Sequence, residues 1–279
     1  MFSTFKATIC KAFKRLDTIK NENPNLNQQT WFEIQPCSTI NMFGKQVVIT
    51  QPSSSFLVYL LGVLTTAVGI YYLAIEDGHM SRILWGWSLI LWGVGALIAG
   101  TSYQAFGYQL KCQNRSVCRW TSWWEVIYMM FQQVSMNVML VAVCYSCTQG
   151  ELLTASIIYA VACSIIYIIL TFIGGFKPIK SWITFERMVW FCAPIMFFFM
   201  GLNGWRYFTL GTAVDLALLG SWALIWLTMI LFWIYDYLGW TNKLWEAKRI
   251  WFSENDVLHV VLIIWAIYLI PMAEYIVDL

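Results

Sequence analysis

Seven long apolar runs occupy the chain after residue 55. Each is bounded by charged or polar residues and has roughly the 20 residues that a helix needs to cross a bilayer. The runs cover residues 56–75, 83–101, 123–147, 152–173, 183–202, 212–235 and 257–276. Short loops join them. The pattern therefore predicts an all-α integral membrane domain over 55–279, a bundle of seven transmembrane helices.

The region before the first run has a different pattern. Within 1–21, apolar side chains recur at spacings of three and four between basic residues, at Phe2, Phe5, Ile9, Phe13 and Leu16. This spacing predicts an amphipathic helix lying on an anionic membrane surface. Residues 22–54 begin without any period and are expected to form a mobile cytoplasmic linker. Two β-like runs within it, 31–34 and 46–50, surround Gly44 and predict a small hairpin.

Composition supports the membrane class. Hydrophobic residues make up 59% of the chain and charged residues 11%, against about 25% in soluble proteins. The aromatic share of 18% suits a protein with two membrane interfaces. A net charge of +2 leaves no basic surface for nucleic acid, so no nucleic-acid partner is expected.

The distribution of basic residues predicts the orientation. If the N-terminus lies in the cytoplasm, 15 of the 17 Lys and Arg residues fall on the cytoplasmic side, and only Arg82 and Arg206 fall outside. Cytoplasmic loops of membrane proteins carry such an excess. We therefore expect a cytoplasmic N-terminus and an external C-terminus, in a membrane that we take to be the inner (cell) membrane of a bacterium.

The eight cysteines do not have the spacing of a zinc knuckle. Cys144 and Cys147 have C-x-x-C spacing but lie in an apolar run, where both should pack as small hydrophobes. Cys112 and Cys118 flank a loop that the predicted orientation puts in the reducing cytoplasm, so we expect no disulfide between them. The glycosylation sequon at Asn114 would be silent on that side.

Small residues in the second run predict close helix packing. Gly86, Gly93 and Gly100 recur every seven residues and leave one helix face nearly bare. That face is expected to contact another helix, of this chain or of a partner or oligomer. Pro194 and Pro271 are expected to kink or end the fifth and seventh helices.

Polar side chains inside the runs or at their ends are the candidates for a functional site, since they are costly in a membrane. Most lie at the cytoplasmic ends of the helices: Ser102, Gln104, Glu125, Glu186, Asp236, Asp256 and His259. Gln132, Gln133 and Asn137 continue this polarity toward the bilayer centre. The pattern predicts a polar pocket that opens to the cytoplasm. Structural explanations stay open, because carboxylates favour helix N-termini and Ser253 with Asp256 has capping spacing.

The seven runs, the polar residues 102–104 and the sequence Glu-Asn-Asp-Val-Leu-His at 254–259 together resemble the seven-helix superfamily of alkaline ceramidases and progestin/adipoQ receptors. Members of that family are membrane-embedded hydrolases of lipid amides. They hold zinc with a histidine of the second helix and an H-x-x-x-H pair of the seventh. The resemblance implies a membrane-lipid or lipid-like ligand, and it makes His259 the first histidine of the pair.

The chain departs from that family at the metal ligands. Ile263 stands where the second histidine of the pair would be, and the second run contains no histidine. Structural and catalytic zinc sites need at least three good protein ligands. We therefore expect no stoichiometric zinc, and the sequence leaves the identity of any other cofactor open.

Three functions remain open. In a lipid amide or ester hydrolase, His259 would act as general base or single strong metal ligand, Asp256 would orient it, and Ser102 with Gln104 would stabilise the oxyanion. The other polar residues would contact the substrate: Glu125, Gln132, Gln133, Asn137, Glu186 and Asp236. Alternatively, the chain is a transporter or ion pathway that runs past Asp215, or a non-enzymatic membrane subunit or receptor. A retinal protein is excluded, because no run carries a lysine at membrane depth.

Overall fold

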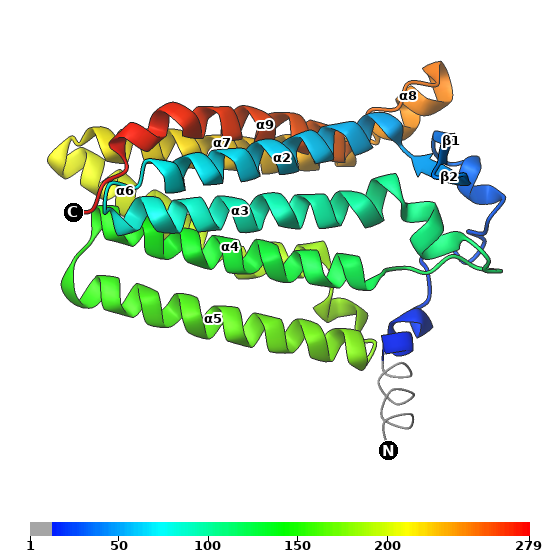
Figure 1. Cartoon of the computed structure of the whole chain (residues 1–279), viewed down its shortest axis with the longest axis horizontal. Helices are drawn as coiled ribbons and strands as arrows, with labels where there is room; N and C mark the ends of the chain where they lie inside the picture. Colours follow the sequence, from blue (N-terminus) through cyan, green and yellow to red (C-terminus); the bar gives the residue numbers. More distant parts are fainter. Residues whose placement is uncertain (1–12) are drawn as a thin grey trace.

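The computed structural model describes residues 13–279 and folds them into one helical bundle (Figure 1). Seven helices in this part of the chain are long and apolar enough to cross a membrane, which confirms a multi-pass integral membrane protein. They are α2 (Pro52–Ala74), α3 (Met80–Gly100), α4 (Trp123–Cys147), α5 (Gly150–Phe176), α6 (Phe185–Leu210), α7 (Ala213–Tyr237) and α9 (Glu254–Met272). The described chain starts at one end of the bundle and finishes at the other. The orientation relative to the two sides of a membrane stays a prediction.

Local signals explain where several helices begin. Pro52 opens α2, where its missing N–H costs nothing. The hydroxyls of Thr184 and Thr212 accept backbone N–H bonds at the starts of α6 and α7. Ser253 and Asp256 form a capping box at the start of α9, as their spacing predicts.

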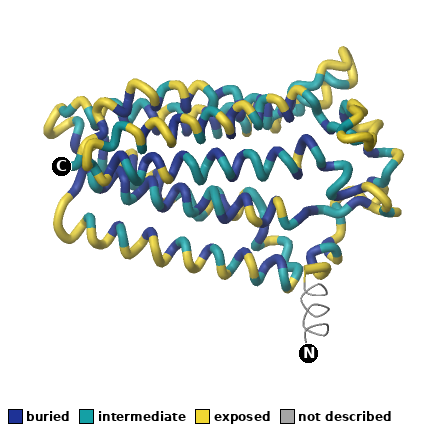
Figure 2. Tube along the Cα trace, viewed as in Figure 1, coloured by how far each residue is buried: buried dark blue, intermediate teal, exposed yellow. Residues whose placement is uncertain are grey.

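Helix α4 lies at the centre of the bundle and α5 at its edge. α4 is the most buried of the seven spans and packs against α3, α5 and α6. α5 is the least buried, and Figure 2 shows exposed residues along its outer side. On the other side of α3, α2 packs against α3 and α9, and α9 packs against α7. Polar side chains on α4 therefore reach mainly other helices.

The glycine face of α3 packs against α2 of the same chain. A Cβ added at Gly93 would meet the backbone of Gly62, and one added at Gly86 would meet the carbonyl of Gly69. A Cβ at Gly100 would meet a side chain of α2. Close packing along this face is thus confirmed, with an intramolecular partner.

The two prolines differ in their effect. α6 continues through Pro194 to Leu210, whereas α9 ends at Met272, directly after Pro271, as predicted. Neighbouring helices in a bundle support such positions.

A large apolar cluster fills the bundle between its two ends. Trp222 stacks on Phe199 with ring centroids 4.2 Å apart and on Trp85 at 6.0 Å. Trp92 of α3 and Trp265 of α9 approach to 5.0 Å. Trp85, Trp222, Phe199 and Trp265 are fully buried in this cluster, which we call the apolar layer.

An antiparallel hairpin lies beside one end of the bundle, which we call the hairpin end. Strands β1 (Cys37–Met42) and β2 (Lys45–Thr50) pair with Met42 opposite Lys45. Phe43 and Gly44 form the turn with φ of 53° and 77°, as a tight hairpin requires. The first strand lies later than predicted, because residues 30–32 form the 3-10 turn η2 (Thr30–Phe32), whose Trp31 is buried and donates to Thr50.

The N-terminal amphipathic helix falls mostly on residues 1–12, outside the described residues. From residue 13 onward, the chain forms the 3-10 helix η1 (Lys14–Thr18) with Leu16 buried. Phe13 packs on Trp123 at 4.9 Å between ring centroids. The following segment, expected to be a mobile linker, contacts the α3–α4 loop. The Gln28 side chain donates to the carbonyl of Arg115, and the backbone N–H of Cys118 donates to the carbonyl of Leu26.

A disulfide closes the loop between α3 and α4, so the expectation of two free thiols is wrong. After α3 the chain continues through the π-helical turns η3 (Thr101–Ala105) and η4 (Tyr108–Cys112). These turns bring Cys112 next to Cys118, with Cα atoms 4.3 Å apart. Asn114 is exposed between these two cysteines, which are six positions apart.

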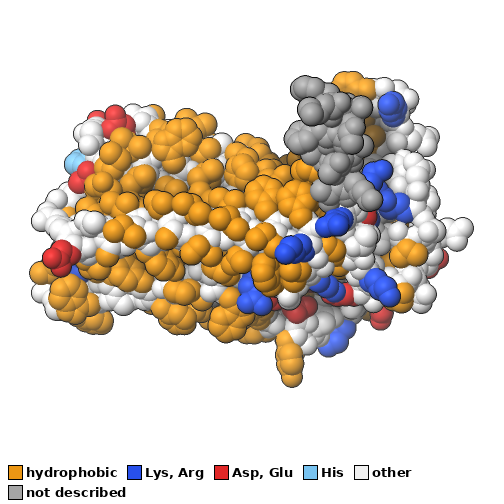
Figure 3. Space-filling view, turned by 90° about the horizontal axis from the view of Figure 1, so that it is seen from below, with side chains coloured by type: hydrophobic (Ala, Val, Ile, Leu, Met, Phe, Trp, Pro, Cys, Tyr) orange, Lys and Arg blue, Asp and Glu red, His pale blue; other side chains and the backbone are white. Residues whose placement is uncertain are grey.

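Figure 3 shows the chemical difference along the bundle. Hydrophobic side chains cover the middle of the visible face, while Lys and Arg gather at the hairpin end. We call the opposite end, where the chain finishes, the far end.

Candidate functional site

A fully buried carboxylate joins α9 to α2 at the hairpin end. Asp256 Oδ2 accepts hydrogen bonds from Ser54 Oγ at 2.9 Å, Ser253 N at 2.6 Å and Ser253 Oγ at 3.1 Å. The Trp251 indole donates to Ser54 Oγ at 3.2 Å. All of these donors to Asp256 are neutral, and none of the ion pairs among residues 13–279 involves this carboxylate.

Three of the sequence-predicted residues at this end carry buried polar atoms without a hydrogen-bond partner among residues 13–279. They are Gln104 Oε1, Asp256 Oδ1 and His259 Nδ1. Other unpartnered atoms occur elsewhere, but within the described chain Asp256 Oδ1 is the sole carboxylate oxygen among them. Leaving such a group unpaired costs about 1–3 kcal/mol. A ligand that supplied partners here would recover that cost.

The structure does not pair Asp256 with His259. The two lie one turn apart on α9, yet Oδ2 of Asp256 bonds to Ser54 and Ser253, and Oδ1 and His259 Nδ1 are both without a partner in the described part of the chain. The histidine is 7% exposed. The hydrogen-bonding capacity of both atoms is therefore unmet within residues 13–279.

A second buried network, around Glu125, has all its charges matched. Ser102 Oγ donates to Glu125 Oε1 at 2.8 Å, Thr121 Oγ1 donates to Oε2 at 2.8 Å, and Lys111 Nζ lies 2.9 Å from Oε1. Ser102 also contacts Ser122 at 2.6 Å between hydroxyl oxygens. The predicted oxyanion donor Ser102 is thus engaged with Glu125.

Sequence reasoning missed Lys111 and Ser54. Lys111 follows the second run by several residues, and only the π-helical turns return it to Glu125. Ser54 lies in the first turn of α2 and belongs to no recognisable motif. It donates to Asp256, which lies 202 residues later in the sequence. The S-x-x-D spacing indicated Asp256, but no sequence pattern indicated that Ser54 would contact it or that Lys111 would pair with Glu125.

The polar residues in the middle of α4 hold helices together. Gln132 donates to the carbonyl of Trp92 at 3.1 Å, and Asn137 donates to Ser164 Oγ at 2.8 Å. Gln133 contacts the thiols of Cys163 and Cys192. These contacts tie α4 to α3, α5 and α6, and the structure does not bring the three residues together with Asp256.

The last two predicted residues are exposed. Glu186 lies in the first turn of α6 at the surface. Asp236, near the end of α7, lines a polar cavity of about 320 Å³ next to the short helix α8 (Trp240–Lys248). A larger, apolar cavity of about 420 Å³ lies between α5 and α6, beside Cys163 and Trp190.

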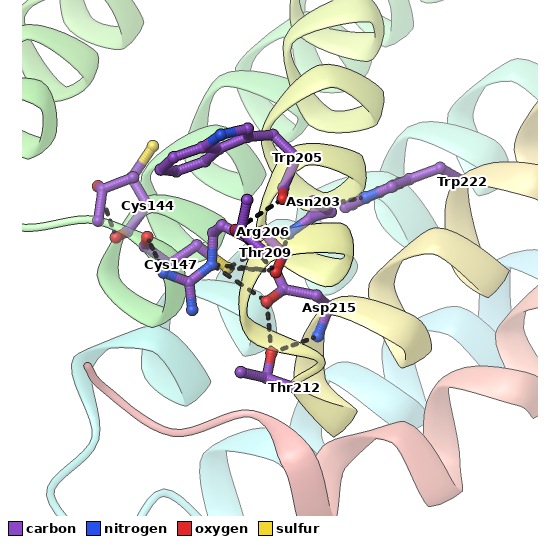
Figure 4. A network of polar contacts seen from close by, with 10 residues as sticks. Cys144, Cys147, Asn203, Trp205, Arg206, Thr209, Thr212, Asp215 and Trp222 are labelled. Carbon is purple, nitrogen blue, oxygen red and sulfur yellow. Dashed lines mark hydrogen bonds and ion pairs between the residues drawn. The ribbon is translucent and has the colours of Figure 1, made fainter.

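The far end carries a buried ion pair, shown in Figure 4. Arg206 Nε lies 3.1 Å from both oxygens of Asp215. Asn203 donates to Asp215 at 2.9 Å and accepts from Trp222 at 2.8 Å, and Thr212 donates to the same carboxylate. Arg206 also caps α4 by donating to the carbonyl of Cys147 at 2.7 Å.

The end of the described chain caps α3 at the same end. Asp278 accepts the backbone N–H groups of Met80 and Ser81, each at 2.8 Å. Burial raises the pKa of the Asp278 carboxyl, but the bonds from Ser81 and Met80 lower it more. The pKa therefore lies below its ordinary value.

Within residues 13–279, no group of three or more His, Cys, Asp and Glu side chains could hold a metal ion. No family model, curated protein or solved structure matches this chain.

Proposed function

We propose that the hairpin end binds the polar headgroup of a lipid-like amphiphile, and that the chain is a divergent member of the ceramidase and adipoQ-receptor superfamily in a bacterial cell membrane. The main support for this proposal is that two buried atoms in the first two turns of α9, Asp256 Oδ1 and His259 Nδ1, have no hydrogen-bond partner among residues 13–279. They lie at the end of a membrane span, which is the depth of lipid headgroups.

The chemistry of these atoms suits a hydroxyl or amide group. A carboxylate oxygen accepts hydrogen bonds, and an imidazole nitrogen donates or accepts according to its tautomer. In a hydrolase, His259 would take the proton of an attacking water, and the Gln104 amide would donate to the developing oxyanion. Ser102, which donates to Glu125, would position that carboxylate.

The apolar layer favours a closed pocket rather than an ion pathway that runs through the whole bundle. From Asn137 to Cys147, α4 rises about 15 Å. Its buried residues over that length include Met139, Leu140 and Val143, which belong to the apolar cluster. A transporter would need polar groups through this layer to reach Asp215.

The replacement His259→Gln tests the proposal. Glutamine keeps approximate size and hydrogen bonding, so the protein should stay folded in detergent. Binding of an N-acyl amide lipid, measured by native mass spectrometry, should fall at least tenfold, and so should any release of fatty acid. His79→Gln is the matched control, because His79 is the other histidine and lies at the far end.

Two results would count against the proposal. The first is unchanged amphiphile binding in His259→Gln. The second is a loss of folding without a selective binding defect, which would make His259 a structural histidine.

A further inference from the structure

The cavity of about 320 Å³ at the hairpin end has an acidic lining. It lies between the start of α2, the end of α7, α8 and the start of α9. Its side chains include two carboxylates, three amides and one indole, from Asp236, Glu254, Gln51, Asn242, Asn255 and Trp251. Among the described residues that line it, none is Lys or Arg.

A third carboxylate lies directly behind this lining. Ser253 and Trp251 form part of the cavity wall, and both belong to the hydrogen-bonded group around Asp256. Asp256 is fully buried, and its Oδ1 has no partner within residues 13–279. A buried carboxylate without a counter-charge is costly, so a nearby cation would stabilise it.

None of these carboxylates has a basic partner in the described chain. The five ion pairs among residues 13–279 involve Asp17, Glu22, Asp77, Glu125 and Asp215. The nearest basic residues in sequence, Lys243, Lys248 and Arg249, are exposed, and Arg249 lies over the ring of Trp245. Asp236, Glu254 and Asp256 therefore leave the cavity with uncompensated negative charge.

The geometry favours an organic cation over a metal ion. The carboxylates do not belong to any cluster of the described residues that could hold a metal. The cavity is near the lower limit of about 300 Å³ for small-molecule sites. Carboxylates, amide oxygens and an indole face are also the groups that recognise ammonium compounds.

We propose that this cavity binds an organic ammonium group, as carried by amine-bearing lipid headgroups. This proposal specifies the headgroup chemistry of the ligand in the proposed function. It rests on that function only for the statement that the ligand is an amphiphile. Asp236 and Glu254 would contact the ammonium, the amides would bind its neighbouring oxygen atoms, and Asp256 would supply charge from behind the wall.

Binding to the full chain in a neutral detergent tests the proposal. Native mass spectrometry compares phosphatidylethanolamine with phosphatidylglycerol. Calorimetry compares choline chloride with sodium chloride at equal ionic strength. We expect phosphatidylethanolamine to bind at least tenfold more tightly than phosphatidylglycerol. Binding of choline without binding of phosphatidylethanolamine would assign the cavity to a free, water-soluble ammonium compound.

The variants Asp236→Asn and Glu254→Gln should each weaken ammonium binding about tenfold, equivalent to 1.4 kcal/mol. Glu254→Gln retains an oxygen for the hydrogen bond from Thr241. Glu246→Gln is the matched control, because Glu246 is exposed on α8 and does not line the cavity. An equal effect of Glu246→Gln, or no preference for either ammonium compound, would overturn the proposal.

The same assay separates this inference from the proposed function. If His259→Gln abolishes binding of the amide lipid while the wild type has no ammonium preference, the cavity assignment falls and the proposed function stands. If the acidic variants weaken ammonium binding while His259→Gln leaves amphiphile binding unchanged, the cavity assignment stands and the role of His259 falls.

Discussion

Two fully buried aspartates, one at each end of the bundle, have opposite surroundings. Asp215 and Asp256 are both 0% exposed. Asp215 has a counter-charge from Arg206 and further donors in Asn203 and Thr212. Asp256 has neutral donors on one oxygen and none on the other within residues 13–279.

This difference separates a structural site from an incomplete one. The network at Asp215 joins α4, α6 and α7 and has its charges matched, so it needs nothing further. The group at Asp256 joins α2 and α9, but one carboxylate oxygen, Oδ1, has no hydrogen-bond partner among residues 13–279. The group forms part of the wall of a polar cavity through Ser253. Burial alone would rank the two aspartates equally, whereas the hydrogen bonds distinguish them.

The largest expected effect is an all-or-none difference in labelling between the two ends. With the predicted orientation, a membrane-impermeant thiol reagent should label Lys248→Cys only from the cytoplasm and Glu151→Cys only from outside. Both residues are exposed, at the hairpin end and the far end respectively.

The same labelling experiment also tests in which compartment the Cys112–Cys118 disulfide lies. Disulfides persist mainly in oxidising compartments, whereas the 15 basic residues put this loop in the cytoplasm. Reversed labelling would contradict the orientation and place the disulfide and Asn114 on the oxidising side. Labelling in the predicted sense would place both cysteines in a reducing compartment, where disulfides are rare.

Matched Asp→Asn replacements compare the two aspartates directly. Asp215→Asn leaves Arg206 buried without a counter-charge and should lower the free energy of unfolding by about 3–5 kcal/mol. Asp256→Asn keeps an acceptor for Ser54 and Ser253 and removes an unpaired charge, so its cost should be under about 1 kcal/mol. Unfolding in mixed micelles measures both. Equal losses would contradict the distinction between the two ends.

A smaller effect is expected at Asp278, which caps α3 at the far end. A pKa below the ordinary value of 3.8 means that the folded protein favours the charged carboxylate. The stabilisation is therefore present above pH 3.8 and is lost as the pH falls through the lower pKa of the folded state.

At neutral pH, Asp278→Asn should cost under about 1 kcal/mol, since solvent screens this partly exposed group. The difference from wild type should shrink in acid. Glu274→Gln, an exposed acid nearby, is the control and should have no such dependence. A difference that grows as the pH falls would contradict the assignment of the cap.

No effect at all is expected from metal removal. Ile263 and the absence of histidine in α3 remove the usual zinc ligands, so protein purified without chelators should contain much less than one zinc per chain. Elemental analysis measures this. One zinc per chain would contradict the expectation and would make Asp256 and His259 its first candidate ligands.

The helical part of the fold was predictable because a membrane span is a local signal. The run at 123–147 coincides with α4. The ends of the other runs lie within a few residues of the helix ends, except that α6 continues beyond residue 202 to Leu210. The hairpin turn at Gly44 was also predicted. The first strand was misplaced, because the apolar character of Trp31 serves a buried 3-10 turn instead of a strand.

The candidate site was less predictable because its contacts are long-range. The capping box of Ser253 and Asp256 follows from their spacing, and the structure confirms it. The pairing of Ser54 with Asp256 and of Lys111 with Glu125 depends on which helices become neighbours. No periodicity within one helix carries that information.

The glycine contacts between α2 and α3 imply an order of assembly. These helices are adjacent in the sequence and pack through backbone, so little chain entropy opposes their pairing once both have left the ribosome. Ser54 is then in place long before α9 is synthesised, and it meets Asp256 only when the last helix arrives. Synthesis halted before α9 should therefore yield a stable α2–α3 hairpin with the hydroxyl of Ser54 uncovered, which membrane quality control could recognise as an unfinished chain.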